Sequence, residues 1–188
     1  PFAVVLFHTG GAGARPKKDG LSATAFPSGV RNTPVEINES IAPIVVWRKG
    51  YRPDSGGPGE YRGGTGQIME IASAEGAPFA IAATFDRVHH APRGREGGLD
   101  GFTGKIELKS GTALRNKGTQ SIPRGDSLHL EMPGGGGYGD PKARDPELVA
   151  MDVRDGMVSA AAALDHYGVV LDAKGAVDTA ATEKRRAE

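Results

Sequence analysis

The stretch Pro133-Gly134-Gly135-Gly136-Gly137-Tyr138-Gly139-Asp140-Pro141 has a proline at each end and five glycines between them. It is too long for a simple turn. Glycine has no Cβ atom, so it reaches positive φ angles and lets another backbone or a ligand approach closely. We therefore expect a shaped loop whose contacts are made by backbone atoms.

Two earlier stretches repeat this composition. They are Asp54-Ser55-Gly56-Gly57-Pro58-Gly59-Glu60-Tyr61-Arg62-Gly63-Gly64-Thr65-Gly66 and Gly10-Gly11-Ala12-Gly13-Ala14-Arg15-Pro16. Three such loops predict a surface built from backbone, which is either catalytic or architectural. Neither earlier loop has the Gly-Lys-Ser/Thr ending of a nucleotide P-loop, so tight packing of turns is favoured over a nucleotide site.

The composition excludes several classes of function. The chain has 188 residues, enough for one domain with a small appendage. Its 23 basic and 23 acidic residues cancel, so we expect neither nucleic acid nor a membrane as a partner. It has no cysteine, which excludes disulfides, thiolate metal sites and cysteine nucleophiles within it. No apolar run approaches the ~20 residues of a membrane span and no signal peptide is visible, so we expect a cytoplasmic protein.

Residues 1–141 are predicted to form a β-rich domain. Apolar and polar residues alternate in several segments, which is typical of half-buried strands in an antiparallel sandwich or open barrel. Trp47 is expected to anchor the core. The predicted strands are Phe2–Phe7, Ile44–Arg48, Gln67–Ala72, Phe79–Phe85, Lys105–Lys109, Thr112–Arg115 and Ser127–Met132.

Residues 142–188 are predicted to form a helical arm, which makes the fold class α+β. Asp145 is a good N-cap for a helix that Gly156 ends, and Ser159 caps a second helix. A terminal helix is expected to start at Asp178 or Thr179.

The first residues suggest that the chain is part of a larger subunit. Phe2–Phe7 is apolar on both strand faces, which predicts a strand buried on both sides. Such a strand needs neighbours on both flanks, and a domain seldom begins with one.

Candidate catalytic residues are few. His8 stands where the first predicted strand meets the first glycine loop, and either serves a site or caps loop carbonyls. Glu36 and Glu39 would share one face of a helix that starts near Pro34, either as an acid–base pair or as ordinary helix and loop contacts.

The remaining histidines favour no metal site. His89 and His90 are adjacent, and adjacent side chains of an extended segment point to opposite faces, so they rarely share one ion. His129 falls on the polar face of its predicted strand, where a solvent-facing role is favoured. We therefore predict no metal and no cofactor bound by this chain.

An ordered series of motifs nevertheless resembles one family, hydantoinase B / 5-oxoprolinase, and specifically the C-terminal portion of the B-type subunit of N-methylhydantoinase-like enzymes. The resemblance covers nearly the whole chain. The motifs are Gly10–Pro16, Asp19-Gly20, Asn32-Thr33-Pro34-Val35-Glu36, Arg52–Gly59 with Arg62-Gly63-Gly64, Pro133–Pro141 and Asp152-Val153-Arg154-Asp155-Gly156.

The resemblance implies a hetero-oligomeric assembly that opens a hydantoin or 5-oxoproline ring with ATP hydrolysis; related members carboxylate ketones. It implies a nucleotide-binding A-type partner subunit, with ATP and magnesium there. It also implies a divalent metal in an N-terminal portion that this chain lacks, so that the chain is inactive alone. Glycine loops would supply N–H donors to charge on oxygen, and Arg15 or Arg31 would supply positive charge. The alternative is a noncatalytic assembly module.

Overall fold

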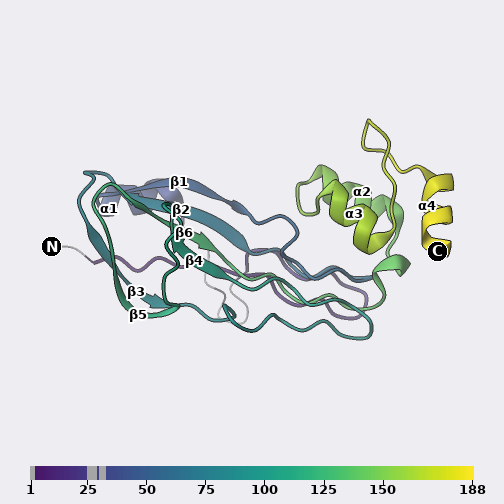
Figure 1. Ribbon diagram of the computed structural model, residues 1–188, viewed down its shortest axis with the longest axis horizontal. Helices are drawn as coiled ribbons and strands as arrows, with labels where there is room; N and C mark the ends of the chain where they lie inside the picture. The colour runs from purple at the N-terminus through teal and green to yellow at the C-terminus, as the bar shows by residue number, and fades with distance from the viewer. Residues whose placement is uncertain (1–2, 25–28, 30–32) are drawn as a thin grey trace.

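The computed structural model describes residues 3–24, 29 and 33–188. The molecule is elongated (Figure 1). Strands gather near the N-terminus, extended segments without regular secondary structure run through the middle, and helices occupy the other end.

Two antiparallel sheets make up the first part. A four-stranded sheet has the order β1-β2-β6-β4, and a two-stranded sheet pairs β3 with β5. A short helix, α1 (Val35–Ile41), lies against β1. The strands are β1 (Ile44–Tyr51), β2 (Gln67–Ser73), β3 (Phe79–Thr84), β4 (Lys105–Leu108), β5 (Lys117–Ile122) and β6 (Ser127–Glu131).

The core lies between these sheets and follows the predicted alternation. Leu128 and Leu130 of β6 point inward and are fully buried. Ile81 and Ala83 of β3 and Ile122 of β5 pack on the same core from the other sheet. The expected α+β class with antiparallel sheets is confirmed, and the sheets stay open instead of closing into a barrel.

Five of the predicted strands are confirmed, but the prediction of a strand at Thr112–Arg115 is wrong. The strand that follows β4 is β5, and Ala113 makes only an isolated bridge to Glu107. The sequence of β5 shows no alternation of apolar and polar residues that would predict a strand. Only Ile122 faces the core, and the other residues are polar and largely exposed.

The expectation that Trp47 anchors the core is also wrong, since its side chain is 68 % exposed. Strand β1 is an edge strand, and its register with β2 shifts between Val46 and Arg48. The bulge takes Trp47 out of the alternation that buries Ile44 and half-buries Val46.

The first predicted strand is not formed, and residues 1–2 lie outside the described residues. Residues 3–8 have no strand assignment. Val4 and Leu6 pack against the core, whereas Val5 is 77 % and Phe7 55 % exposed. This segment is therefore buried on one face only.

The three glycine-rich stretches come together in one body, joined by a fourth segment. We call this body the glycine bundle; it comprises residues 9–24, 53–66, 92–102 and 133–139. The segments run side by side along the long axis (Figure 1) and exchange backbone hydrogen bonds with one another. These hydrogen bonds give the bundle an architectural role.

Residues 133–139 lie at its centre, because they bond to three different neighbours in turn. Every third residue of the stretch faces the same neighbouring segment. The bonds are Gly134 and Gly137 N–H to Phe102 and Leu99 C=O, Gly135 and Tyr138 N–H to Gly64 and Tyr61 C=O, and Gly11 and Ala14 N–H to Pro133 and Gly136 C=O. A three-residue period without internal hydrogen bonds is that of the polyproline II conformation.

Glycine is required in this stretch chiefly for space. A Cβ atom on Gly134 would overlap the carbonyl oxygen of Ser55, and one on Gly135 would overlap that of Ala12. Only Gly139 of the stretch has a positive φ, at 76°. Close approach of backbones is therefore the property that this sequence supplies.

Replacing Gly135 with alanine should lower the free energy of unfolding by about 3 kcal/mol, because a methyl group has no room between the segments. Urea unfolding followed by circular dichroism measures the loss. Gly50→Ala is the matched control, since nothing lies within 4 Å of a Cβ atom there. Equal stability of the two variants would contradict the packing described here.

The helical arm (residues 142–188) contains a 3₁₀ turn and three α-helices. They are η1 (Pro141–Ala143), α2 (Pro146–Arg154), α3 (Ala160–Tyr167) and α4 (Thr179–Ala187). The 3₁₀ turn begins one residue before the arm as defined. The predicted caps Asp145 and Ser159 are confirmed, since their side chains accept N–H groups of the first turns. The terminal helix starts at Thr179, one of the two expected positions, and the Asp178 side chain caps it. Val149, Ala163 and other apolar residues form a separate small core. Among the described helices, none is long and apolar enough to cross a membrane.

Candidate functional site

A buried ionic cluster joins the arm to the glycine bundle. The side chain of Arg144 is only 1 % exposed. Its guanidinium binds both carboxylate oxygens of Asp19, at 2.8 and 2.7 Å, and one oxygen of Asp152 at 2.8 Å. It also donates to the Glu60 carbonyl at 3.0 Å, and Arg62 binds the other Asp152 oxygen at 3.2 Å. Two partners belong to the arm and three to the bundle, so the cluster fixes one against the other.

The pKa values in this cluster keep its charges in place. Burial disfavours the charged form of Asp19, but the hydrogen bonds and charge of Arg144, with the Arg62 N–H, outweigh it and hold the Asp19 pKa below 3.8. Burial also opposes the charge of Arg144, yet Asp19 and Asp152 raise its pKa above 12.5. Burial raises the pKa of nearby Tyr167, which stays neutral. Asp19 and Arg144 therefore stay charged near neutral pH, and their ion pair has a structural role.

Two further contacts support the same junction. The Asp54 side chain accepts the Ser159 N–H at 2.7 Å, and the Asp54 N–H donates to the Met157 carbonyl at 3.0 Å. From α4, Arg186 donates to the carbonyls of Tyr167, at 3.0 Å, and Arg144, at 2.7 Å. The arm is thus held along its length.

Replacing Arg144 with leucine should cost about 3–5 kcal/mol of unfolding free energy, because two carboxylates lose their buried partner. Chemical denaturation at neutral pH measures it. Arg154→Leu is the control: that side chain is 75 % exposed and 3.8 Å from Asp155, so a change within about 0.5 kcal/mol is expected. Similar losses in both variants would rule out a special role for the cluster.

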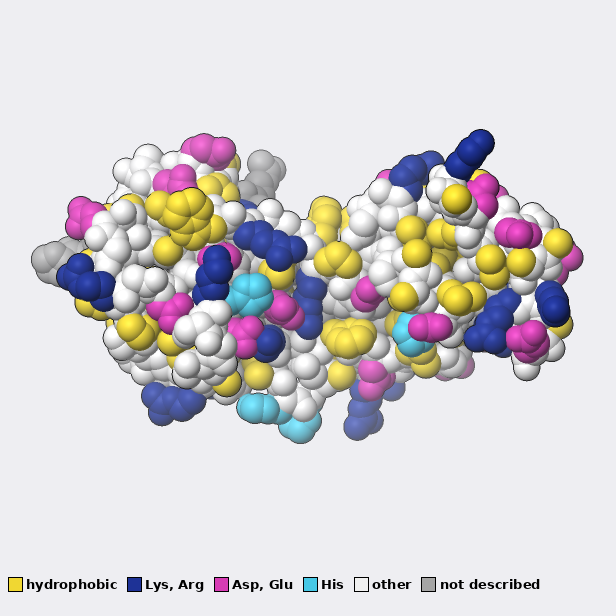
Figure 2. Space-filling view, turned by 45° about the horizontal axis from the view of Figure 1, so that its top comes forward, with side chains coloured by type: hydrophobic (Ala, Val, Ile, Leu, Met, Phe, Trp, Pro, Cys, Tyr) yellow, Lys and Arg dark blue, Asp and Glu magenta, His cyan; other side chains and the backbone are white. Residues whose placement is uncertain are grey.

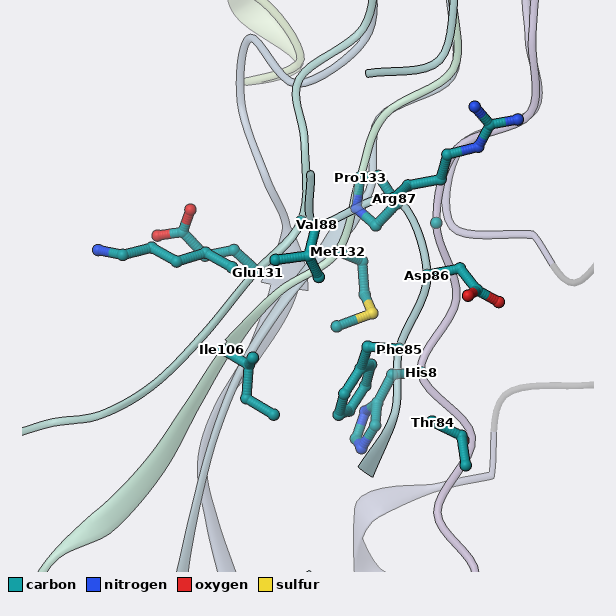
Figure 3. A pocket seen from close by; sticks show the side chains of 13 residues that line it. His8, Thr84, Phe85, Asp86, Arg87, Val88, Ile106, Glu131, Met132 and Pro133 are labelled. Atoms are coloured by element: carbon teal, nitrogen blue, oxygen red, sulfur yellow. The ribbon is translucent and has the colours of Figure 1, made fainter. Parts of the chain in front are cut away.

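A small cavity of about 180 Å³ lies where the sheets meet the bundle. Figure 3 shows the His8 ring beside Phe85, with the Met132 sulfur above them and Ile106 across the cavity. The ring centroids of His8 and Phe85 are 6.3 Å apart. Apolar side chains thus form part of the lining, and the polar or charged side chains that complete it are His8, Thr84, Asp86, Arg87, Lys105 and Glu131.

His8 is held neutral in this position. Burial, and to a lesser degree the charge of Lys49, lowers its pKa to about 4. Its Nδ1 atom lies against the sulfur of Met69. An imidazole with this pKa is a weak base at neutral pH, so His8 lines the cavity as an uncharged group.

The two carboxylates that line the cavity are already paired, since Asp86 binds Lys117 at 2.7 Å. Glu131 binds Arg52 at 2.8 Å and lies 3.2 Å from the His129 ring nitrogen. Arg52 also donates to the Thr103 carbonyl at 2.6 Å. The cavity therefore combines apolar side chains with a neutral ring, and both of its carboxylates are engaged in ion pairs.

The unfolding free energy should fall as the pH is lowered from about 6.5 to about 4, because His8 takes up a proton in the unfolded chain before it does so in the folded one. The unfolded state binds more protons in this window, so stability rises with pH there. The full loss is about 3 kcal/mol. Urea unfolding at several pH values should show this slope in the wild type and a weaker one in His8→Phe. His166→Phe, at an exposed position of α3, should keep the slope, and an unchanged slope in His8→Phe would contradict the assignment.

The other sequence candidates do not meet at this cavity. Glu36 and Glu39 do lie on a helix, α1, but Glu36 is exposed and Glu39 accepts the Val46 N–H at 2.8 Å. Arg15 is exposed in a turn, where its backbone forms an isolated β-bridge with the backbone of Lys18. Arg31 lies outside the described residues. Of the candidates that the structure describes, only His8 lines the cavity.

The outer face of the four-stranded sheet carries paired charges. Cross-strand register puts Arg48, Glu70, His129 and Glu107 in one row. Lys109 binds Glu70 at 2.6 Å. Figure 2 shows acidic and basic side chains interspersed with histidine over the sheet-bearing end. The His129 side chain is on the polar face, as expected, but it is half-buried among these charged groups and does not face solvent freely.

No group of three histidine, aspartate or glutamate side chains is arranged to hold a metal ion among residues 3–24, 29 and 33–188. His89 and His90 are both exposed. The sequence reasoning missed Arg144 as the centre of the ionic cluster, although the motifs around Asp19, Arg62 and Asp152 marked its partners. No local signal marks Arg144 itself, since it is one basic residue among many.

Comparison with known proteins identifies the family. Residues 1–141 match the family model described as Hydantoinase B/oxoprolinase. The chain is 34 % identical over 187 residues to the B-type subunit of a putative D-/L-hydantoinase of Pseudomonas sp. (strain NS671), covering 94 % of this chain and 31 % of that protein. It is 36 % identical over 135 residues to 5-oxoprolinase 1 of Arabidopsis thaliana, covering 69 % of this chain and 10 % of that protein.

A solved structure matches the fold. The crystal structure of ATP-dependent caprolactamase from Pseudomonas jessenii is similar with a TM-score of 0.79 at 30 % sequence identity, covering 96 % of this chain and 33 % of that one. The chain belongs to the Hydantoinase B/oxoprolinase family, as the motif series indicated. It spans about a third of the length of the hydantoinase subunit that it matches.

Proposed function

We propose that this chain is the C-terminal part of a B-type subunit in an ATP-dependent hydrolase that opens cyclic amides, and that it is inactive alone. The carrying observation is the match of 96 % of the chain to the ATP-dependent caprolactamase structure. Caprolactam, hydantoin and 5-oxoproline, which the names of the relatives specify, are all cyclic amides. A ring of this class is the proposed substrate.

The contacts within the chain indicate what it contributes. The N–H groups of Gly134, Gly135 and Gly137 all donate to carbonyls inside the bundle, so they are not available to an oxyanion. The buried charged side chains of the ionic cluster likewise form ion pairs with one another, so they are not available to a substrate. We propose that the chain supplies a rigid wall, which positions other parts of the complex.

The reactive groups are then proposed to lie elsewhere. An amide carbonyl is a poor electrophile, and ATP can convert its oxygen into a phosphate leaving group. ATP with magnesium would bind an A-type subunit, and a divalent metal would bind the N-terminal portion of the B-type subunit. The cytoplasmic location expected from the sequence remains a prediction.

The proposal is tested with the complete B-type subunit, as its gene encodes it, co-purified with an A-type partner. ATP hydrolysis should be stimulated by at least one of hydantoin, caprolactam and 5-oxoproline, with stoichiometric ring opening. The 188-residue chain alone should show no turnover. Turnover by the chain alone, or an intact complex that turns over none of these rings, would contradict the proposal.

Two outcomes separate the alternatives. ATP use that requires bicarbonate and acetone would indicate a ketone carboxylase. A stable complex without ATP turnover would indicate a noncatalytic assembly module. In an active complex, Arg15→Met should lower turnover at least tenfold if this exposed cation acts on the reaction, and unchanged turnover would remove it from consideration.

A further inference from the structure

The part of the molecule that contains residues 3–8 carries uncovered apolar surface. Among the described residues, seven large hydrophobic side chains are at least half exposed, and six of them lie within the first 47 residues. These six side chains come from residues 3–8, the glycine bundle, α1 and β1, and the two that belong to residues 3–8 are Val5 and Phe7. A soluble monomer seldom exposes a contiguous apolar patch without a partner for it.

Two neighbouring extended elements share this property. In residues 3–8, Val4 and Leu6 pack on the core while Val5 and Phe7 point outward. Strand β3 repeats the pattern, with Phe79 and Ile81 on the core side and two exposed alanines on the other. The two elements approach each other at His8 and Phe85. We call Val5, Phe7, Ala80 and Ala82 the outer apolar face.

The backbone of residues 3–8 is also unsatisfied. Their N–H and C=O groups have no hydrogen-bond partner among the described residues, and the first backbone bond in this region is from the Thr9 N–H to the Gln67 side chain at 3.1 Å. Extended backbone with free donors and acceptors is a template for another strand. Apolar outward side chains next to it favour a strand that also covers them.

The sheet beside this segment is small. Among the described strands, β3 and β5 pair only with each other, and one side of this pair packs on the core through Ile81, Ala83 and Ile122. A segment of the same polypeptide would cover the exposed side better than a second copy of the chain, because a tether raises its effective concentration to the millimolar range. The related subunits have the required length, since this chain covers 31 % of the hydantoinase subunit and 33 % of the caprolactamase chain.

We propose that an extended segment from the part of the B-type subunit outside these 188 residues pairs with the backbone of residues 3–8 and covers the outer apolar face. This rests on the proposed function only in taking the chain to be part of a longer subunit. Strand pairing can be present in a complex without turnover, and turnover can occur without it, so the two proposals fail separately.

Hydrogen–deuterium exchange of the complete B-type subunit tests the pairing. The amides of Val5, Leu6 and Phe7 should exchange at least tenfold more slowly in the complete subunit than in the 188-residue chain, at every protein concentration. Protection that is lost on dilution would assign the face to a second copy. Protection that appears only with the A-type partner would assign it to that partner. Each of these two results would overturn the proposal. Fast exchange of these amides in the complete subunit would also overturn it, and so would a gene that encodes no further residues.

A pair of variants tests the apolar contact independently. Phe7→Asp should lower the melting temperature of the complete subunit by several degrees but leave the 188-residue chain nearly unchanged, because Phe7 is already exposed there. Ala173→Asp, in an exposed turn of the helical arm, should be silent in both proteins. Equal effects of Phe7→Asp in the two proteins would contradict a covering segment.

Discussion

Close contact between backbones in the stretch 133–139 is the constraint on which the rest of the structure depends. This stretch bonds to three neighbouring segments in turn, with a period of three residues. The segments approach so closely that Cβ atoms on Gly134 or Gly135 would overlap carbonyl oxygens. Stability here comes from many hydrogen bonds between segments and from dense packing of main chain, not from apolar side chains.

The bundle links two parts that each have a small core of their own. On one side it continues into the four-stranded sheet through β2 and β6, which flank residues 66 and 133. On the other side it holds the helical arm through Arg144, whose ion pairs reach Asp19 and Asp152. A rigid connector of this kind transmits position between its two ends.

Much of the fold could be predicted from local patterns. Alternation identified β6 and its buried leucines, and Asp145, Ser159 and Asp178 marked the three arm helices, because these signals depend on nearest neighbours only. Two predictions failed where tertiary context overrides such signals. A bulge on an edge strand turned Trp47 outward, and the nearly all-polar β5 carried no apolar alternation to reveal it.

The sequence by itself determined the family, through an ordered series of glycine, proline and acidic motifs, and it determined where backbones must meet, because only glycine permits that contact. It could not tell which backbones meet. The tertiary structure decided that Asp19, Arg62 and Asp152 surround Arg144, and that His8 lines a cavity while Glu36, Glu39 and Arg15 do not. These contacts join residues far apart in the chain, and long-range pairing leaves no trace in local composition or periodicity.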